Sequence, residues 1–477
     1  MHTNPTHCQK IGSLPLFTTA VLFAVLGFLA QAPAQKNLAP HDPNSGVSRA
    51  LQGAEHADDV EFKTLYAFEA PAATTLTSAL GSQPDTTPAV GPDGAIYGMT
   101  SDGGTFGNGV IYRFDRDSHR YIVLHTFSAM DSNGDNADGA APGNGLTAGP
   151  HGVFYGMAYL GGLNGNGTVF SITASGEFNV LHTFSAVDSN GHNQDGKGPL
   201  RDIIIGNDGS LYGTTRTGGP NDCLFTHGCG VAWTIDSEGN FSVIYQFTAV
   251  EGHAASLTQG LDGYLYGCAV WPATSLPPGP LPSGILYRMA PWGGDFQVLY
   301  TFSQTNASGQ NMDGADCYQP LVETRPGVFY GAAYHGGSNG NGVVFRYSLD
   351  YPGVVEVVHD FSAVNSTGQN WDGAGPASPL ALGPHGTLYS VANSGGANGS
   401  GVVYSLREDG NFEVLHAFSA TNATTGANSD GATPDDGVIL DGNKLIGIAE
   451  YGGNGSAAGL GNSGGTLYEL KLDDPWH

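Results

Sequence analysis

Hydrophobic and polar residues alternate along many short stretches of the chain, most clearly in stretches that begin with glycine. Residues 109–114, 342–347 and 465–470 each carry an aromatic side chain three places after the glycine and a polar side chain directly after that. A period of two, with β-branched and aromatic residues enriched, predicts strands with one face more buried than the other. After residue 35 no stretch keeps a helical period of 3.6 residues. The pattern therefore predicts an all-β protein.

Two motifs recur seven times each along the chain. The first is a hydrophobic run ending in phenylalanine, at Phe68, Phe127, Phe184, Phe247, Phe302, Phe361 and Phe418, so that one unit spans about 58 residues. The second is a hydrophobic residue followed by Tyr-Gly, at Tyr97, Tyr155, Tyr212, Tyr266 and Tyr330, which degrades to Tyr389-Ser390 and Ile446-Gly447. A Gly-Gly pair usually follows the second motif. Each unit then holds four short strands.

Four-stranded units that repeat radially are typical of the blades of a β-propeller. The first element, residues 62–68, is a fourth strand with no first three before it, and residues 438–472 supply three strands with no fourth. Together they complete a seventh blade and leave no long free edge, whereas a solenoid would need polar capping repeats. We expect a seven-bladed β-propeller over residues 62–472, a flexible linker over residues 35–61 and a tail over residues 473–477.

The N-terminal region has the three-part layout of a secretory signal peptide. Lys10 precedes an apolar run over residues 14–30, and Ala32-Pro33-Ala34 forms a small-residue cleavage pattern. Residues 1–34 are therefore expected to be a signal peptide, and the mature protein to be secreted, periplasmic or extracellular, without membrane contact. The alternative is an uncleaved anchor, for which 17 apolar residues are marginal.

Composition and charge narrow the possible partners. Charged residues make up 12% of the chain and the formal net charge is −27. Nucleic acids and anionic membranes need a basic footprint, so neither is an expected partner. A surface rich in uncharged polar residues suits cations, neutral polymers or cationic ligands.

The repeat motifs resemble the GloVer tandem-repeat family of exported bacterial proteins. Leu211-Tyr212-Gly213-Thr214-Thr215, with Gly218-Gly219, matches one half of that repeat, and Gly167-Thr168-Val169-Phe170, with the run ending at Phe184, matches the other. The resemblance covers about residues 62–472. It implies an exported, propeller-like protein whose biochemical role is not established, so it assigns no catalytic residues.

Strand directions place the long polar loops on one face and the short turns, such as residues 91–94, on the other. Five units share an Asp/Asn-rich loop after the phenylalanine, and its late aspartates are Asp138, Asp195, Asp313, Asp372 and Asp430. We expect ring closure to bring these five near the axis as a broken acidic ring that binds a ligand.

The first of these loops is also a candidate calcium site. Asp131, Asn133 and Asp135 offer oxygens at alternate positions, and Asp138 follows. The alternative is that the Asp-Gly and Asn-Gly pairs only make turns, with aspartates hydrogen-bonded to their own backbone. We expect no cofactor other than calcium.

Cysteines and one irregular unit add two further expectations. Cys223 and Cys229 are expected to close a local disulfide, and Cys268 and Cys317 to join adjacent blades, although four cysteines allow three pairings and a zinc site is the alternative. The unit around Tyr266 lacks both the Gly-Gly pair and the Asp-Gly loop. It carries Trp271 and a proline-rich stretch instead, which we take as a candidate wall of a ligand groove.

Three functions fit this sequence. The first is a monomeric, non-enzymatic binding or scaffold protein that presents its long-loop face to a glycan, polymer or protein. The second is a secreted polysaccharide hydrolase or lyase with carboxylates near the axis, for which Glu251, Glu323 and Glu450 are candidates. The third is a structural surface component. Fold alone does not choose among them.

Overall fold

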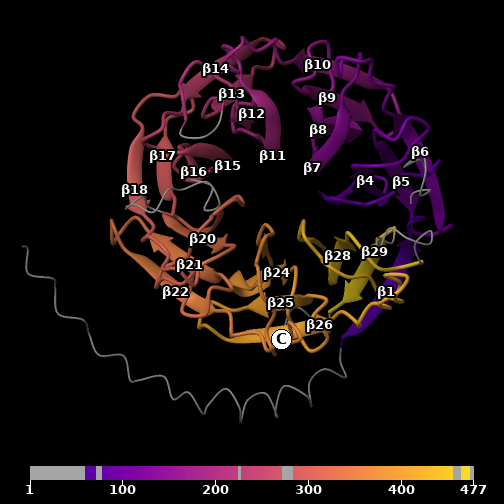
Figure 1. Ribbon diagram of the computed structural model, residues 1–477, viewed down its shortest axis with the longest axis vertical. Coiled ribbons are helices and arrows are strands. Elements are labelled where there is room, and N and C mark those ends of the chain that lie inside the picture. Colours follow the sequence, from indigo (N-terminus) through magenta and orange to yellow (C-terminus); the bar gives the residue numbers. More distant parts are fainter. Residues whose placement is uncertain (1–59, 71–77, 224–226, 271–282, 455–463, 473–477) are drawn as a thin grey trace, which may run out of the picture. The chain divides into compact units, whose positions relative to one another are not determined.

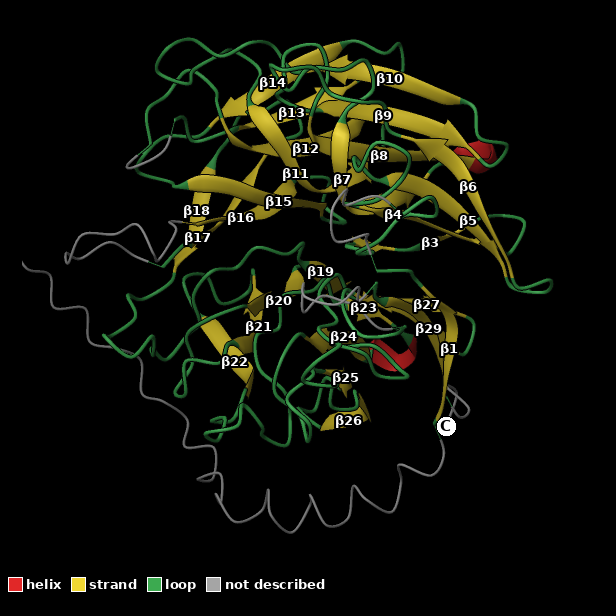
Figure 2. Ribbon diagram, turned by 45° about the vertical axis from the view of Figure 1, so that its right-hand side comes forward, coloured by secondary structure: helices red, strands yellow, loops and turns green. Residues whose placement is uncertain are grey.

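Seven antiparallel sheets follow one another around a central axis in the computed structural model of the chain (Figure 1). The structure describes residues 60–70, 78–223, 227–270, 283–454 and 464–472. The expected seven-bladed propeller is confirmed. The expected signal peptide, most of the expected linker, the tail and Trp271 lie outside the described residues. Helical structure in the described residues is confined to two 3-10 turns, η2 (Pro150–Gly152) and η4 (Pro384–Gly386), drawn red in Figure 2.

Each blade is one sheet, and in blades 1 to 6 the four main strands run outward from the axis in sequence order. Blade 1 comprises β3 (Ala89–Val90), β4 (Ile96–Thr100), β5 (Val110–Asp115) and β6 (Arg120–Thr126). Blade 2 comprises β7 (Ala140–Ala148), β8 (Val153–Leu160), β9 (Thr168–Thr173) and β10 (Phe178–Thr183), and β2 (Thr86–Thr87) adds to it by pairing in parallel with β7. Blade 3 comprises β11 (Lys197–Ile205), β12 (Leu211–Thr217), β13 (Val231–Ile235) and β14 (Phe241–Gln246).

The remaining blades continue in the same order. Blade 4 comprises β15 (His253–Gln259), β16 (Leu265–Val270), β17 (Ile285–Met289) and β18 (Gln297–Thr301). Blade 5 comprises β19 (Val322–Arg325), β20 (Val328–Ala333), β21 (Val343–Ser348) and β22 (Val355–Asp360). Blade 6 comprises β23 (Ala381–Leu382), β24 (Leu388–Ala392), β25 (Val402–Leu406) and β26 (Phe412–Ala417). Blade 7 comprises β27 (Val438–Asp441), β28 (Lys444–Ala449), β29 (Thr466–Lys471) and β1 (Glu61–Ala67).

The ring closes through β1, the N-terminal strand, which forms the outermost strand of blade 7. It pairs antiparallel with β29, from Glu61 opposite Lys471 to Ala67 opposite Thr466. The last blade therefore takes strands from both ends of the propeller. No helix in the described part of the chain is long and apolar enough to cross a membrane.

A β-bulge interrupts the outermost strand of every blade at the same place. In blade 2, Val180 pairs with Phe170 and His182 with Val169, so Leu181 is the extra residue, and the other six blades shift register at the equivalent position. A bulge re-aims the side chains that follow it. In six blades the aromatic or imidazole ring after the bulge then stacks on an aromatic side chain at or just before the outermost strand of the next blade, as His182 does on Phe241 with centroids 3.6 Å apart.

A second contact between blades joins a proline to a glycine. The proline stands just before or at the start of an innermost strand, and the glycine precedes the third strand of the blade before. A Cβ on Gly401 would lie 2.5 Å from Cδ of Pro434, and the equivalent pairs are Gly109–Pro142, Gly167–Pro199, Gly342–Pro376 and Gly465–Pro84. Glycine is required here because any side chain would push the two blades apart.

Between blades 4 and 5 a disulfide replaces the proline contact. Cys317 occupies the proline position and is bonded to Cys268 in β16. Cys223 and Cys229 form the second, local bond. Both expected pairings are confirmed, and the zinc alternative is wrong because the sulfur atoms are bonded to one another.

The two disulfides should differ in their effect on stability. Replacing Cys268 and Cys317 together with alanine should lower the free energy of unfolding by about 4 kcal/mol, because their bond closes the longer loop of the unfolded chain. Replacing Cys223 and Cys229 should cost roughly 2 kcal/mol, since their separation is only 6 residues. Urea unfolding of the two double variants measures the difference. Equal losses would contradict the assignment of the long-range bond as the blade-to-blade link.

Candidate functional site

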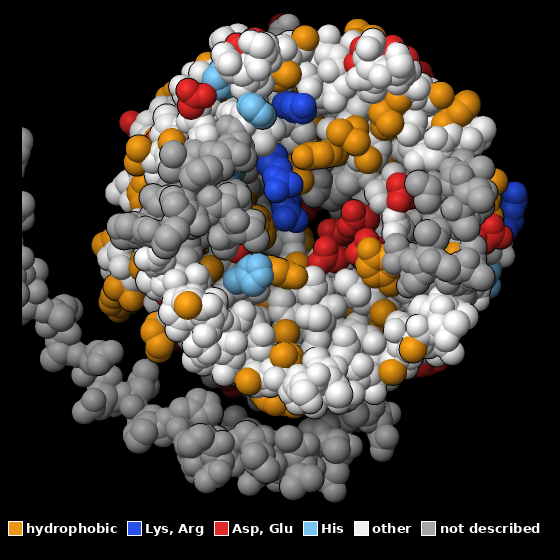
Figure 3. All heavy atoms as spheres, viewed as in Figure 1, with side chains coloured by type: hydrophobic (Ala, Val, Ile, Leu, Met, Phe, Trp, Pro, Cys, Tyr) orange, Lys and Arg blue, Asp and Glu red, His pale blue; other side chains and the backbone are white. Residues whose placement is uncertain are grey.

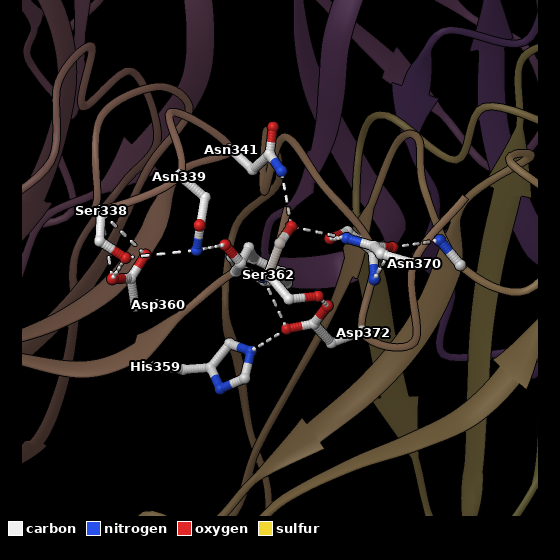
Figure 4. Close-up of polar contacts among 11 residues, drawn as sticks. Ser338, Asn339, Asn341, His359, Asp360, Ser362, Asn370 and Asp372 are labelled. Carbon is white, nitrogen blue, oxygen red and sulfur yellow. Dashed lines mark hydrogen bonds and ion pairs between the residues drawn. The ribbon is translucent and has the colours of Figure 1, made fainter. Parts of the chain in front are cut away.

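The five late aspartates lie at the joints between blades. Asp372 is fully buried, and its carboxylate accepts hydrogen bonds from His359 Nε2 (3.1 Å), from the Ser362 amide (3.0 Å) and from the Ser362 hydroxyl (Figure 4). The Ser362 carbonyl in turn accepts from the side-chain amides of Asn341 (2.6 Å) and Asn370 (2.9 Å). These bonds hold the end of β22 to the loop that enters blade 6.

The same arrangement recurs at four other joints. The ring partners are His125 for Asp138 (2.9 Å), His182 for Asp195 (3.0 Å), Tyr300 for Asp313 (2.7 Å) and His416 for Asp430 (3.0 Å). Although burial raises the pKa of Asp138, hydrogen bonds from His125 and Ser128 lower it below its usual range. The expected acidic ring at the axis is therefore wrong, because the bulge turns the His or Tyr of an outermost strand toward each aspartate. Binding of a ligand by these carboxylates stays a prediction.

Two of the three candidate glutamates also have structural contacts. Glu251 replaces the missing aspartate at the joint between blades 3 and 4, accepting from Tyr245 Oη (3.1 Å) and the Thr248 amide (2.7 Å). Glu323 accepts from the amides of Leu261 and Gly327, both at 2.6 Å. Glu450, by contrast, lies beside other acids, as described below.

In the first loop Asp131 caps its own backbone. Its Oδ1 accepts from the amides of Asn133 (2.7 Å) and Asp135 (3.0 Å). Asn306 and Asn365 make the same two bonds in later loops, so the turn does not need a charge. Among the described residues, the carboxylates that converge closely enough for a metal are those of Asp85, Asp435 and Asp436, and not those of this loop. Calcium binding at Asp131, Asn133, Asp135 and Asp138 stays a prediction.

Residues that follow the repeated proline, or Cys317 in its place, face the axis in five blades, and sequence reasoning missed them. Asp85, Leu200, Tyr318, Ala377 and Asp435 stand in equivalent positions in five blades. They differ in charge and size, unlike the residues of the joints. In Figure 3 basic side chains gather on one side of the central hollow and acidic side chains on another. The repeated proline marks these positions and could have revealed them.

A cavity of about 200 Å³ opens on the basic side, between blades 3 and 4. Arg201, Arg216, His253 and Tyr318 line it, together with the apolar side chains of Leu200, Ala254, Ala255 and Val270. The guanidinium carbon of Arg201 lies 5.3 Å from the centre of the Tyr318 ring. The ion pairs of arginine and lysine among the described residues use Arg113, Arg116, Arg325, Arg346 and Lys444, but not Arg201 or Arg216.

His253 is buried in the wall of this cavity. Its Nδ1 lies 3.0 Å from the backbone carbonyl of Arg216, so this nitrogen donates and the ring is held in one orientation. Burial lowers the pKa of His253 below its usual range, which keeps the imidazole neutral at pH 7. Burial also raises the pKa of Tyr318, to about 12.

The acidic side of the hollow belongs to blades 1 and 7. Burial and the neighbouring carboxyls of Asp85 and Asp435 raise the pKa of Asp436 well above its usual range. Burial and the charges of Asp85, Asp435 and Asp102 together raise the pKa of Glu450 to about 7. Burial also raises the pKa of Asp85, and the charge of Arg201 offsets only part of the increase at Asp85 and Asp436. The hollow is thus electrically polarised across its width.

Below the two charged walls the innermost strands draw together. Arg201, Asp202, Gln319 and Asp436 line a gap with no room for water. Side chains link neighbouring innermost segments here: Thr147 donates to the Ile203 carbonyl (2.5 Å), and Ser378 to that of Asp435. The hollow is therefore a funnel with a closed neck.

A larger groove of about 570 Å³ lies at the opposite face, between blades 1 and 7. Four of its charges are paired with one another: Arg116 with Asp441 at 2.6 Å and Lys444 with Glu469 at 2.8 Å. A ligand would have to compete with these pairs. The funnel, whose arginines are outside the ion pairs, is the stronger candidate site.

Comparison with protein families identifies the repeat. The sequence profile of the Gloeobacter/Verrucomicrobia repeat matches residues 57–223 and 201–460. The chain belongs to this family. The resemblance drawn from the motifs is therefore confirmed. No curated protein matches the chain.

Solved structures share the fold of this Gloeobacter/Verrucomicrobia repeat protein at low sequence identity. An oligogalacturonate lyase in complex with manganese is 13% identical, with a TM-score of 0.50, and the match covers 88% of this chain and 98% of the lyase. A puromycin-hydrolysing peptidase of Mycobacterium tuberculosis is 11% identical, with a TM-score of 0.47; the match covers 80% of this chain and about half, 52%, of the peptidase. These similarities concern the fold alone.

Removing a joint carboxylate should destabilise the ring. Asp372→Ala leaves His359 and Ser362 without their buried acceptor, so we expect a loss of about 3 kcal/mol in the free energy of unfolding. Urea unfolding measures it, with Asp131→Asn as the control that should change stability by less than about 0.5 kcal/mol. A loss for the control as large as for Asp372→Ala would contradict the structural role assigned to the joint.

The neck should make stability depend on pH through Asp202. Burial raises the pKa of Asp202 to about 6, against 3.8 for an ordinary aspartate. Above pH 6 the carboxylate is ionised in the folded protein although it is buried, and this lowers the free energy of unfolding. Asp202→Asn should therefore stabilise the protein at pH 7.5, by at most about 3 kcal/mol. The gain should disappear as the pH falls below about 4, where both states are protonated.

Urea unfolding of this variant at the two pH values tests the prediction. Asp208→Asn is the matched control, because hydrogen bonds from the Ser210 amide (3.0 Å) and Tyr212 Oη (2.9 Å) outweigh burial and lower the pKa of Asp208. That substitution should destabilise the protein at pH 7.5. A stabilising Asp208→Asn would show that the effect is not specific to the neck.

Proposed function

We propose that this protein is an exported binding protein that captures a carboxylate-bearing sugar unit of a polysaccharide in the funnel of its propeller. The observation that carries the proposal is the convergence of Arg201 and Arg216 on one cavity, in a chain with only 16 basic residues. Guanidinium groups outside internal ion pairs are suited to bind carboxylates through two parallel hydrogen bonds.

Size and lining favour a sugar over a larger anion. A cavity of about 200 Å³ is smaller than the sites of drug-sized ligands, which suits one sugar unit at the end of a chain. The Tyr318 ring and the apolar side chains of Val270 and Ala255 supply a surface for the weakly polar face of the ring. Arg216 is exposed at the rim and Arg201 lies deeper, so a ligand would meet the outer charge first.

Export is supported by two observations. The apolar run and cleavage pattern of residues 1–34 fit a secretory signal peptide. Both disulfides favour an oxidising compartment over the cytosol.

Direct binding tests the proposed ligand. Isothermal titration with short oligouronates should give saturable binding that the corresponding neutral sugars do not give. Arg216→Gln should weaken it by about 10- to 100-fold, the value of one or two hydrogen bonds to a charged group. Arg346→Gln, which removes an arginine paired with Glu356 on another part of blade 5, should leave binding unchanged. Equal affinity for neutral sugars, or an unaffected Arg216→Gln variant, would refute the proposal.

A second candidate function, a lyase acting on the same class of ligand, is favoured by His253. A neutral imidazole, oriented by the Arg216 carbonyl, can take a proton from a carbon next to a carboxylate, and two arginines can stabilise the charge that develops. The electron pair left on that carbon then forms a carbon–carbon double bond as the glycosidic C–O bond on the adjacent carbon breaks, and the departing oxygen takes a proton from water. The similar fold of an oligogalacturonate lyase is consistent with this but does not support it independently. Release of an unsaturated product, followed by ultraviolet absorbance, separates the two functions. Turnover that His253→Gln abolishes while binding persists would establish the lyase; binding without turnover would establish the binding protein.

A further inference from the structure

Three carboxylates converge where the propeller ring closes. Asp85 precedes β2 in the first unit, and Asp435 and Asp436 precede β27 in the last, so the residues come from opposite ends of the propeller sequence. One oxygen of each lies within 4.8 Å of those of the other two. Any two ligands of a cation at about 2.4 Å are separated by no more than twice that distance, so the three oxygens can share one ion.

A buried and unpartnered oxygen distinguishes this group from an ordinary acidic cluster. Asp436 is 6% exposed, and its Oδ2 is buried with no N–H or hydroxyl donor; the contact of this carboxyl with Asp85 needs a shared proton. Such an atom normally has a partner, because leaving it without one costs the full desolvation of a charged group. Asp435 is held in place at the same time, since its Oδ1 accepts from Asn393 Nδ2 at 2.9 Å.

The described protein groups do not balance this charge. Arg201 is the cation that faces the group, and it acts on Asp85 and Asp436, while Asp102 and Glu450 add two further carboxyls. A proton shared between Asp85 and Asp436 would neutralise one charge, but it would leave the third carboxylate and the surrounding acids uncompensated. A divalent cation would compensate more of the charge and would supply a partner for Asp436 Oδ2.

We propose that Asp85, Asp435 and Asp436 bind a hard divalent cation at the closing junction of the propeller, with Ca²⁺ the foremost candidate. Carboxylate oxygens are the ligands that Ca²⁺, Mg²⁺ and Mn²⁺ prefer, whereas zinc and copper favour nitrogen or sulfur. Ca²⁺ tolerates the irregular geometry of three carboxylates from two blades better than Mg²⁺ does. The bound ion links the segment before β2 to the segment before β27. This inference does not depend on the sugar proposed above.

Titration of the purified protein with Ca²⁺ alone, after treatment with a chelator, tests the site. Isothermal titration should show one site per chain, and saturating Ca²⁺ should raise the unfolding temperature by several degrees over the chelated protein. Asp436→Asn should weaken binding at least 10-fold and abolish the temperature shift. Asp409→Asn, the matched control at an exposed turn aspartate outside both candidate calcium sites, should leave both unchanged.

Folding of the variants is checked separately in chelator. Asp436→Asn removes one of several close like charges, so its urea midpoint should equal or exceed that of the unsubstituted protein. Should it fail to fold, Asp435→Asn at the more exposed position takes its place and should weaken Ca²⁺ binding in the same way. Absence of Ca²⁺ binding at millimolar concentration, undiminished binding by the Asp436→Asn or Asp435→Asn variant, or loss of binding in Asp409→Asn would each overturn the proposal.

Discussion

Each joint between neighbouring blades has to hold the end of an outermost strand and the start of the next innermost strand at one place. In five joints an aspartate does so, because its carboxylate accepts hydrogen bonds from the His or Tyr side chain after the bulge and from a serine. In a sixth joint Glu251 has this role. A buried carboxylate tolerates this position only because its oxygens are fully hydrogen-bonded. Most of the polar chemistry of the long loops is therefore used to hold the ring together.

The demands of the joints leave the axis as the place where the units can differ. Residues after the repeated proline have no partner role that is common to all blades, and they range from Asp85 to Leu200 and Tyr318. Cationic groups enter from blade 3 and carboxylates from blades 1 and 7, so a symmetric scaffold encloses an asymmetric lining. Low-dielectric walls strengthen the field between the two sides. The funnel is thus suited to orient a polar ligand, and its closed neck limits how far that ligand can enter.

Repetition made the fold predictable, while the same repetition misdirected the choice of site. Seven copies of the motif ending in phenylalanine fix the number of blades, and the incomplete first and last units predict the closure through β1. Asp138 and Asp195 drew attention because they recur, yet recurrence here reflects a structural task. Arg201 and Asp436 stand out only in three dimensions, since nothing in their local sequence shows that blades 3 and 7 face each other. The bulge that turns His125 toward Asp138 was equally hidden, because it depends on pairing between two strands.

Closure through β1 also determines when the ring can form. Its partner β29 lies roughly 400 residues further along the chain, and bringing two such distant segments together costs about 5 kcal/mol of chain entropy. The four main strands of each of blades 1 to 6 are consecutive and can assemble while the chain is still emerging, but β1 has no partner until the last blade exists. The final pairing is therefore a late, non-local folding step, of the kind that slows folding and leaves a strand edge exposed. Until that pairing forms, β1 and β29, at opposite ends of the propeller sequence, each present an unpaired edge.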